Sequence, residues 1–298
     1  MDTANRIIAL DIGGTHTRVA LICSARTLPP NRTVYLVDSF PTSTEYDAEI
    51  ERIVTVTRAA RGQAEARGAR IEGLGISIGG RMRADGSRLA VAPNLPGYVD
   101  RPLVSDLSER SGLPARAAHD TVCGLLGERG WGALASSERC AYLTMSTGLG
   151  AAIYLASWGQ STGLHVSIEM GHQILDGSAR ACLCGQIGCL ETYVGGRQLE
   201  LRHGAPLDSF HDATVWETLS DKLALGLVNL TQLTRVEVVA VGGGVALART
   251  ELLSELQVRV DARLRNARLR IVPAALGEHA PLVGAAALLT TDPGTILS

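Results

Sequence analysis

Two segments that lie far apart in the chain share one layout, in which an apolar run enters a turn of glycine and threonine and a second apolar run leaves it. The first is residues 6–22 with the turn Asp11-Ile-Gly-Gly-Thr15, and the second is residues 139–155 with the turn Ser146-Thr-Gly-Leu-Gly150. A third glycine turn, Gly242-Gly-Gly244, follows another apolar run. The first two segments are predicted to be β-hairpins whose turns carry polar atoms.

Helical segments separate these strand-bearing turns. Residues 48–66 and 102–112 have helical patterns, the second with Ser105 as its predicted N-cap and Gly112 as its stop. Strands that alternate with helices predict α/β layers, and two similar halves predict two lobes with a cleft. Because no low-complexity linker separates the halves, the boundary is placed near Ala118.

Length and charge disfavour several classes of protein. The 298 residues suffice for one large domain or for two ordinary lobes. The 28 basic and 30 acidic residues leave a formal net charge of -2, which disfavours nucleic acid and anionic membranes as partners. No apolar run approaches the roughly 18 residues that span a bilayer, and no secretory signal is evident, so a cytoplasmic protein is predicted.

The glycine turns favour nucleotide binding. Lys222 is the only lysine, so a phosphate site must use backbone amides, arginine or a metal ion. Glycines let amides approach phosphate oxygens, while Asp11 can face a cation or its water shell. One such turn alone is more often a plain hairpin turn, but three together favour a nucleotide site. The residues assigned to it are Asp11, Gly13, Gly14, Thr15, Thr147, Gly148, Gly243 and Gly244.

A dinucleotide-binding fold is the alternative, because Gly73-Leu-Gly75 and Gly148-Leu-Gly150 look like incomplete Rossmann fingerprints. The Rossmann turn must open a helix whose N-terminus holds the pyrophosphate. After Gly150 the sequence Ala-Ala-Ile-Tyr-Leu continues as a strand, so this alternative is rejected.

A cluster of cysteines predicts a metal site. His172 precedes Cys182, Cys184 and Cys189, and one nitrogen with three sulfur ligands forms a complete tetrahedral set for zinc. Four protein ligands leave no open coordination position, so the zinc would be structural. The alternative, buried free cysteines beside an unrelated histidine, is disfavoured because three cysteines within eight residues are unusual outside metal sites.

Together these motifs resemble the ROK family (repressors, open reading frames and sugar kinases) of the actin-like ATPase superfamily. The order and spacing fit from about residue 6 to residue 290, and the resemblance implies an α/β, two-lobed actin-like (ribonuclease H-like) fold with a cleft between the lobes. The implied N-terminal lobe is 1–118, with a helix at 281–298 returning to it, and the C-terminal lobe is 119–280 with a zinc loop at 172–189. The matching segments are Asp11-Ile-Gly-Gly-Thr15, Glu169-Met-Gly-His172, Cys182-Leu-Cys-Gly-Gln-Ile-Gly-Cys-Leu-Glu191 and Gly242-Gly-Gly244.

The resemblance also implies an activity, the ATP-dependent phosphorylation of a hexose-like hydroxyl with Mg²⁺. Asp120 would be the general base that takes the hydroxyl proton, although without the family it reads equally as a helix N-cap. Zinc would hold His172 by one ring nitrogen and leave the other towards the sugar. Family members are often dimers or tetramers, so a homo-oligomer is expected. The implied sugar-binding residues are Gly80, Arg81, Asn94, His119, Asp120, Glu169, His172 and Glu191.

The chain departs from the family pattern beside the base. ROK kinases commonly carry Asn immediately before the catalytic Asp, whereas this chain has His119, which could alter both the sugar contacts and the ionisation of Asp120. Gly150-Ala151-Ala152 replaces a run of glycines. The helical part between Gly196 and Leu227 looks short, which puts the usual dimer contacts in doubt.

Three functions are therefore weighed. A sugar kinase is favoured, with glucose as the first acceptor and an N-acylmannosamine, another hexose or a cyclitol as alternatives. Gly80-Arg81 resembles N-acylmannosamine kinases, while the segment around Asn94 resembles bacterial glucokinases. A sugar-binding sensor that has lost catalysis is the second function. A ROK repressor needs a helix-turn-helix before the first glycine turn, and the ten residues before Asp11 are too few for one.

Overall fold

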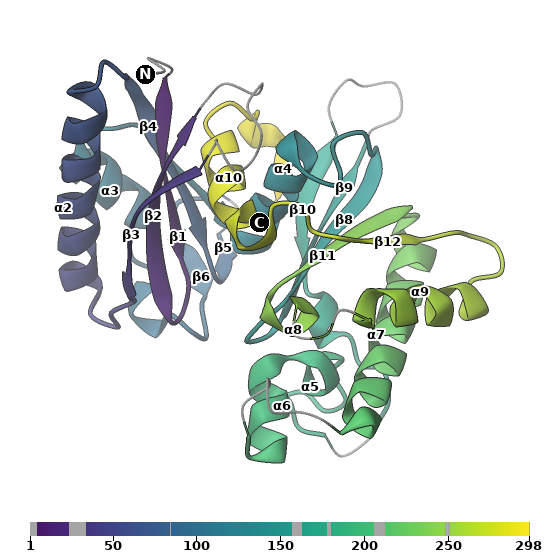
Figure 1. Cartoon of the computed structure of the whole chain (residues 1–298). Coiled ribbons are helices and arrows are strands. Elements are labelled where there is room, and N and C mark those ends of the chain that lie inside the picture. The colour runs from purple at the N-terminus through teal and green to yellow at the C-terminus, as the bar shows by residue number, and fades with distance from the viewer. Residues whose placement is uncertain are drawn as a thin grey trace. The chain divides into compact units, whose positions relative to one another are not determined.

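The chain forms two compact units in this computed structural model (Figure 1), which describes residues 5–23, 34–83, 85–156, 163–177, 180–205, 212–247, 249 and 251–297. Unit 1 comprises Met1–Ala135, Leu164–Val166 and His279–Ser298, and unit 2 comprises Ser136–Gly163 and Ser167–Glu278. Unit 1 thus extends to Ala135, whereas the sequence predicts a boundary near Ala118. Helix α4 (Asp120–Trp131) belongs to unit 1 because it packs against α10 (Ala280–Ala287).

A five-stranded sheet in the order β3-β2-β1-β4-β7 forms the centre of unit 1. The first predicted hairpin is confirmed, since β1 and β2 pair antiparallel from Arg6↔Cys23 to Ile12↔Thr17. Strands β4 and β7 extend the sheet in parallel. Strand β1 is apolar on both faces, and its residues Ile8, Ala9 and Leu10 have no exposed surface. The bounds are β1 Arg6–Ile12, β2 His16–Cys23, β3 Val34–Pro41, β4 Ile71–Ile78 and β7 Ala115–His119.

Helices cover both faces of this sheet. Figure 1 shows α2 (Tyr46–Glu65) and α3 (Leu103–Ser111) on one side and α10 with α4 on the other. The helices predicted at 48–66 and 102–112 are confirmed, and Gly112 ends α3 in the left-handed conformation with φ of 67°. Ser105 is not the N-cap. Instead α3 begins after Pro102, whose fixed φ suits a helix start, and the Ser105 hydroxyl bonds back to the Pro102 carbonyl.

Small residues bring α10 close to its neighbours. A Cβ on Gly284 would lie 1.6 Å from the Cys123 carbonyl oxygen of α4, and a Cβ on Gly75 of β4 would lie 2.0 Å from the Ala285 carbonyl oxygen. Both positions therefore require glycine. The remaining short strands of the described chain are β5 Arg81–Met82, β6 Leu89–Val91, β10 Leu164–Ile168 and β13 Ile296–Leu297, of which β10 and β13 pair in parallel.

Unit 2 contains strands in the order β12-β11-β8-β9. The second predicted hairpin is confirmed, since β8 and β9 pair antiparallel from Arg139↔Leu155 to Met145↔Leu149. Strand β11 lies parallel to β8 and β12. The strands are β8 Arg139–Met145, β9 Leu149–Leu155, β11 Val238–Gly242 and β12 Arg270–Pro273, and the helices are α5 Glu191–Val194, α6 Gly196–His203, α7 Ala213–Thr234, α8 Gly244–Leu247 and α9 Leu252–Arg263.

The long helix α7 organises the other helices of unit 2. It packs against α9 on one side and α5 on the other, and Leu219, Leu223 and Leu227 are fully buried along it. Its Asp212 N-cap accepts a hydrogen bond from the Thr214 amide. Within the residues that the structure describes, no helix is long and apolar enough to cross a membrane.

Candidate functional site

Two side chains on one face of the unit 1 sheet bind the Asp11 carboxylate. Arg18 and Ser77 are the register partners of Asp11 on β2 and β4, and side chains at paired positions point to the same face. Arg18 Nη2 donates to Asp11 Oδ2 at 2.6 Å, and Ser77 Oγ donates to Oδ1 at 2.7 Å. Burial raises the pKa of the Asp11 carboxyl above its ordinary 3.8, and the nearby charge of Asp120 raises it further, against the opposing effect of Arg18.

In the first glycine turn the carbonyls of Gly13 and Thr15 accept hydrogen bonds, while two backbone amides donate to no protein group that the structure describes. The Gly13 amide donates to the His16 carbonyl at 3.0 Å, while Thr42 donates through its hydroxyl to the Gly13 carbonyl and through its amide to the Thr15 carbonyl. Within the described chain, the amides of Gly14 and Thr15 donate to no protein acceptor. Backbone amides without a protein acceptor, called outward amides below, are the donors that a phosphate group requires.

Asn94 lies directly against this turn. A Cβ on Gly14 would be 2.6 Å from the Asn94 Cβ, so glycine is needed for the close approach. The neighbouring turn at Gly80 has φ of 119°, and a Cβ there would be 2.7 Å from the Val91 carbonyl oxygen. Arg81 follows at the start of β5 and is exposed, as is Asn94. Unit 1 thus brings Asn94 against the first turn, with Gly80 in the neighbouring turn.

Asp120 opens helix α4 and has an unsatisfied oxygen. His119 is the N-cap of α4, because its Nδ1 accepts a hydrogen bond from the Thr121 amide at 3.3 Å. In the neutral tautomer that accepts this bond, Nδ1 does not donate to Asp120 Oδ1, although the two atoms are 2.9 Å apart, and Nδ1 also lies 2.7 Å from Thr121 Oγ1. Among the described residues no donor satisfies the buried Oδ1. This oxygen is therefore available to accept a proton.

The second glycine turn is held by the start of helix α6. The amides of Gly196 and Arg197 donate to the carbonyls of Ser146 and Thr147 at 2.8 and 3.0 Å. The amides of Thr147 and Gly148 donate to no acceptor in the described part of the protein, as at Gly14 and Thr15. Both predicted phosphate turns therefore contain two successive amides without a described protein acceptor.

The third glycine turn packs on the second hairpin. Gly243 has φ of 93°, and a Cβ there would be 2.2 Å from the Met145 carbonyl oxygen. Gly244 is the first residue of α8, and no atom lies within 4 Å of a Cβ built on it. The structure therefore places the second and third turns side by side in unit 2, with open space beside Gly244.

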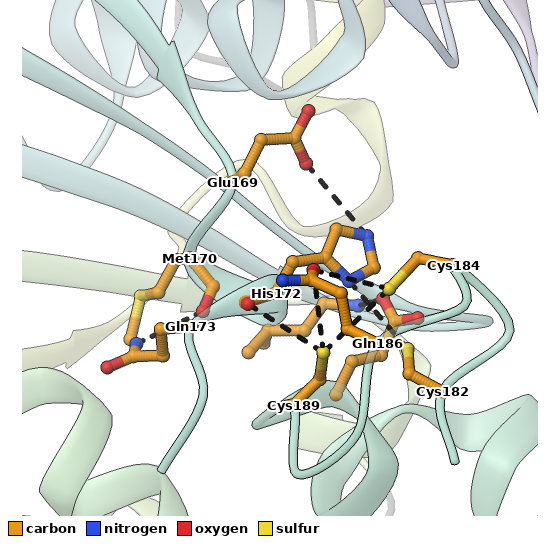
Figure 2. A network of polar contacts seen from close by, with 10 residues as sticks. Glu169, Met170, His172, Gln173, Cys182, Cys184, Gln186 and Cys189 are labelled. Atoms are coloured by element: carbon orange, nitrogen blue, oxygen red, sulfur yellow. Dashed lines mark hydrogen bonds and ion pairs between the residues drawn. The ribbon is translucent and has the colours of Figure 1, made fainter.

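Four potential metal ligands converge in the loop before α5 (Figure 2). The ligand atoms of His172, Cys182, Cys184 and Cys189 all lie within 4.8 Å of one another. The Cys184–Cys189 sulfur pair and the Cys182 Sγ–His172 Nδ1 pair are each 3.8 Å apart. A tetrahedron with zinc–sulfur bonds of about 2.3 Å has edges of about 3.8 Å, so these spacings fit zinc.

The imidazole of His172 faces two different groups. Its Nδ1 points towards the cysteine sulfurs, while its Nε2 lies 4.0 Å from Glu169 Oε2, as Figure 2 shows. Glu169 is largely exposed, with 65% of its side chain accessible. The loop turns through Gly185 and Gly188, which have φ of 91° and 82°. The ring orientation is the one expected for a metal-held histidine whose other nitrogen faces a ligand.

Two residues around Asp11 and one contact of the second glycine turn were not predicted from the sequence. Arg18 and Ser77 were not predicted, although alternation along β2 would have placed Arg18 on the face of Asp11. Glu191 was predicted only as a sugar residue, but its Oε2 also accepts a hydrogen bond from the Leu149 amide at 2.9 Å. No local sequence pattern links positions 149 and 191.

Comparison with known proteins identifies the family. A model of the ROK family matches residues 7–292. The N-acetyl-D-glucosamine kinase of Citrobacter koseri is 27% identical over 310 residues, which cover 95% of this chain and 98% of the kinase. The xylose repressor of Bacillus subtilis is 24% identical over 235 residues and 73% of this chain, and the match spans only 60% of the repressor's length.

Solved structures agree with the mixed α/β fold described above. The structure of a ROK family glucokinase from Streptomyces griseus, in complex with glucose and AMPPNP, superposes with a TM-score of 0.75. It is 22% identical in sequence, and the match covers 95% of this chain and 99% of that one. The chain therefore belongs to the ROK family and has the actin-like ATPase fold of its sugar kinases.

Proposed function

We propose that the protein is an ATP-dependent kinase that phosphorylates a hydroxyl of a hexose, with Asp120 as the general base. The observation that carries the proposal is the pairing, within unit 1, of a turn with outward amides and a buried Asp120 oxygen that no donor satisfies. The first feature suits a phosphate and the second suits a hydroxyl proton.

In the proposed reaction the acceptor oxygen attacks the γ-phosphorus of ATP and gives its proton to Asp120. A phosphorus–oxygen bond forms to the sugar as the bond to the β-phosphate oxygen breaks, and ADP leaves. Mg²⁺, when bound, supplies positive charge to the phosphates. Asp11, which accepts a hydrogen bond from Arg18, is the carboxylate that would face this ion or its water shell.

The acceptor residues are those that the family resemblance implies. Hydroxyl groups are recognised by carboxylates, amides and imidazoles, because an apolar pocket distinguishes them poorly. Zinc held by His172 and the three cysteines would orient His172 Nε2 without taking part in phosphoryl transfer. The residues proposed for the acceptor are Gly80, Arg81, Asn94, His119, Asp120, Glu169, His172 and Glu191.

Glucose is the proposed first acceptor. It is supported by the glucose-bound ROK glucokinase of similar fold and by Asn94, which lies beside the first turn. The relative that phosphorylates N-acetyl-D-glucosamine favours an N-acylhexosamine as the next candidate, ahead of other hexoses and cyclitols. A cytoplasmic location and a homo-oligomeric state stay predictions.

A sugar-binding sensor without catalysis is the second candidate. Two observations favour it, the similarity to a xylose repressor and the replacement of the usual Asn by His119 beside the base. A sensor would use the same acceptor residues but would not turn over ATP.

A coupled ADP-release assay separates the two candidates. Mg²⁺-ATP is supplied with a panel of hexoses, N-acylhexosamines and cyclitols, and the phosphorylated product is identified by mass spectrometry. Turnover that depends on one acceptor supports the kinase and names its substrate. Sugar binding by thermal shift without turnover on any acceptor would favour the sensor instead.

A further inference from the structure

We infer that Glu191 is a positioning residue for the second glycine turn, in addition to its proposed contact with the acceptor. The inference rests on the proposed function, because it assigns Thr147 and Gly148 to ATP. It goes beyond that function in stating that one carboxylate joins the two binding sites. Sugar affinity and nucleotide affinity should then both depend on Glu191.

The carboxylate of Glu191 is bound to the turn itself. Its Oε2 accepts the hydrogen bond of the Leu149 amide at 2.9 Å, directly after the two outward amides of Thr147 and Gly148. A hydrogen bond to an ionised acceptor is stronger than one between neutral groups. One carboxylate oxygen is thus committed to the turn, and Oε1 is left to face a ligand.

Glycines confine the Glu191 side chain to this position. A Cβ on Gly148 would be 2.6 Å from Glu191 Oε2, and one on Gly195 would be 2.9 Å from Glu191 Cγ. A Cβ on Gly171, between Met170 and His172, would lie 3.4 Å from Glu191 Cβ. A Cβ at Gly148 or Gly195 would therefore displace the Glu191 side chain, whereas a Cβ at Gly171 would only touch it at an ordinary contact distance.

Glu191 is also tied to the metal loop. Cys189, one of the four candidate zinc ligands, lies two residues earlier, and its carbonyl accepts hydrogen bonds from the amide and the hydroxyl of Thr192. The Leu190 amide donates to the Gln173 carbonyl, next to His172. The zinc loop, Glu191 and the turn thus form one hydrogen-bonded path within unit 2.

This path has a thermodynamic consequence. If acceptor binding at Oε1 orders Glu191, it also orders the amides that bind phosphate, and the two ligands must then favour each other's binding equally. The coupling should disappear when the bond to Leu149 is removed.

Nucleotide affinity without sugar tests the inference directly. Binding of Mg²⁺-AMPPNP is measured by titration calorimetry for the wild type, Glu191→Gln, Glu191→Asp and Glu191→Ala, with Glu169→Ala as the matched control. Gln keeps an acceptor of the right length for Leu149, whereas Asp keeps the charge but is one methylene shorter. Glu169 is another predicted sugar residue, and its carboxylate lies 4.0 Å from His172 Nε2.

We expect about tenfold weaker AMPPNP binding for Glu191→Ala and Glu191→Asp, and binding within about threefold of wild type for Glu191→Gln and Glu169→Ala. Hydrogen exchange should show that the Leu149 amide loses protection in Glu191→Ala and keeps it in Glu191→Gln. This readout also identifies a variant that has failed to fold, because protection is then lost throughout unit 2.

Two results would overturn the inference. Wild-type AMPPNP affinity in Glu191→Ala and Glu191→Asp would remove Glu191 from the nucleotide site and leave the proposed kinase standing. Equal weakening in Glu191→Gln and Glu191→Ala would show that charge, and not the bond to Leu149, matters. A wild-type protein that binds no AMPPNP would overturn the proposed function and the inference together.

Discussion

The substitution Gly284→Ala should separate helix α4 from helix α10 and displace Asp120. A Cβ on Gly284 would lie 1.6 Å from the Cys123 carbonyl oxygen, whereas ordinary Cβ contacts begin at 3.4 Å. The helices must therefore move apart by about 2 Å at this point. Helix α10 cannot retreat towards β4, because Ala285 already touches the backbone of Gly75.

The expected loss of stability follows from this packing, in which α10 lies between α4 and β4 and cannot move away from either. Overpacking of a core costs about 1–3 kcal/mol, and a contact between two backbones that cannot relax belongs at the upper end, about 3 kcal/mol. For 298 residues, whose entropy of unfolding is about 0.6 kcal/mol/K, that lowers Tm by about 5 °C. Because α4 begins at Asp120, a shift of this size should also lower turnover by about 100-fold.

Gly130→Ala provides the matched control within the same helix. Gly130 is exposed near the end of α4, and no atom lies within 4 Å of a Cβ built there. Alanine favours a helix over glycine by up to about 1 kcal/mol, so this variant should be unchanged or slightly more stable. Thermal and urea unfolding of both variants measure the difference. A Gly284→Ala protein as stable as Gly130→Ala would refute the close packing of α4 on α10.

Three further predictions concern the candidate sites. Asp11→Asn should abolish binding of Mg²⁺-AMPPNP yet raise Tm at pH 7. Burial raises the pKa of the Asp11 carboxyl in the folded protein above its ordinary 3.8. The protonated carboxyl therefore stabilises the fold below pH 3.8, and this stability is lost as the pH rises through the folded pKa. The gain should vanish towards pH 4, and a lower Tm at pH 7 would contradict it. Zinc removal by a chelator should lower Tm and weaken sugar binding, both restored by added zinc, whereas an unchanged Tm would exclude a structural metal. His119→Asn should keep the α4 cap, with stability within about 0.5 kcal/mol of wild type, but change the ranking of acceptors in the ADP-release panel. An unchanged ranking would show that His119 does not contact the acceptor.

The features that sequence predicted correctly depend on neighbouring residues. Apolar runs on either side of the turn glycines predicted the hairpins at β1–β2 and β8–β9. The spacing of Cys182, Cys184 and Cys189 predicted their convergence, because a loop so short keeps them together. Gly112 was predicted as a helix stop for the same local reason.

The features that sequence missed depend on contacts between distant segments. Ser77 reaches Asp11 only through the register of β1 against β4, and Glu191 reaches Leu149 only through the path of the chain after the zinc loop. Residues 119–135 belong to unit 1 because helix α10, from the far end of the chain, packs on α4. Neither strand register nor the docking of a remote helix can be predicted from a local sequence pattern.

The most direct test of the central claim is the turnover of Asp120→Asn on the acceptor that the wild type phosphorylates. Asparagine has nearly the same shape as aspartate but cannot take the hydroxyl proton. We predict that kcat falls by about 10²–10⁴-fold, while the Kd values for the acceptor and for Mg²⁺-AMPPNP stay within about threefold of wild type. An Asp120→Asn protein that turns over at the wild-type rate would contradict the assignment of Asp120 as the base.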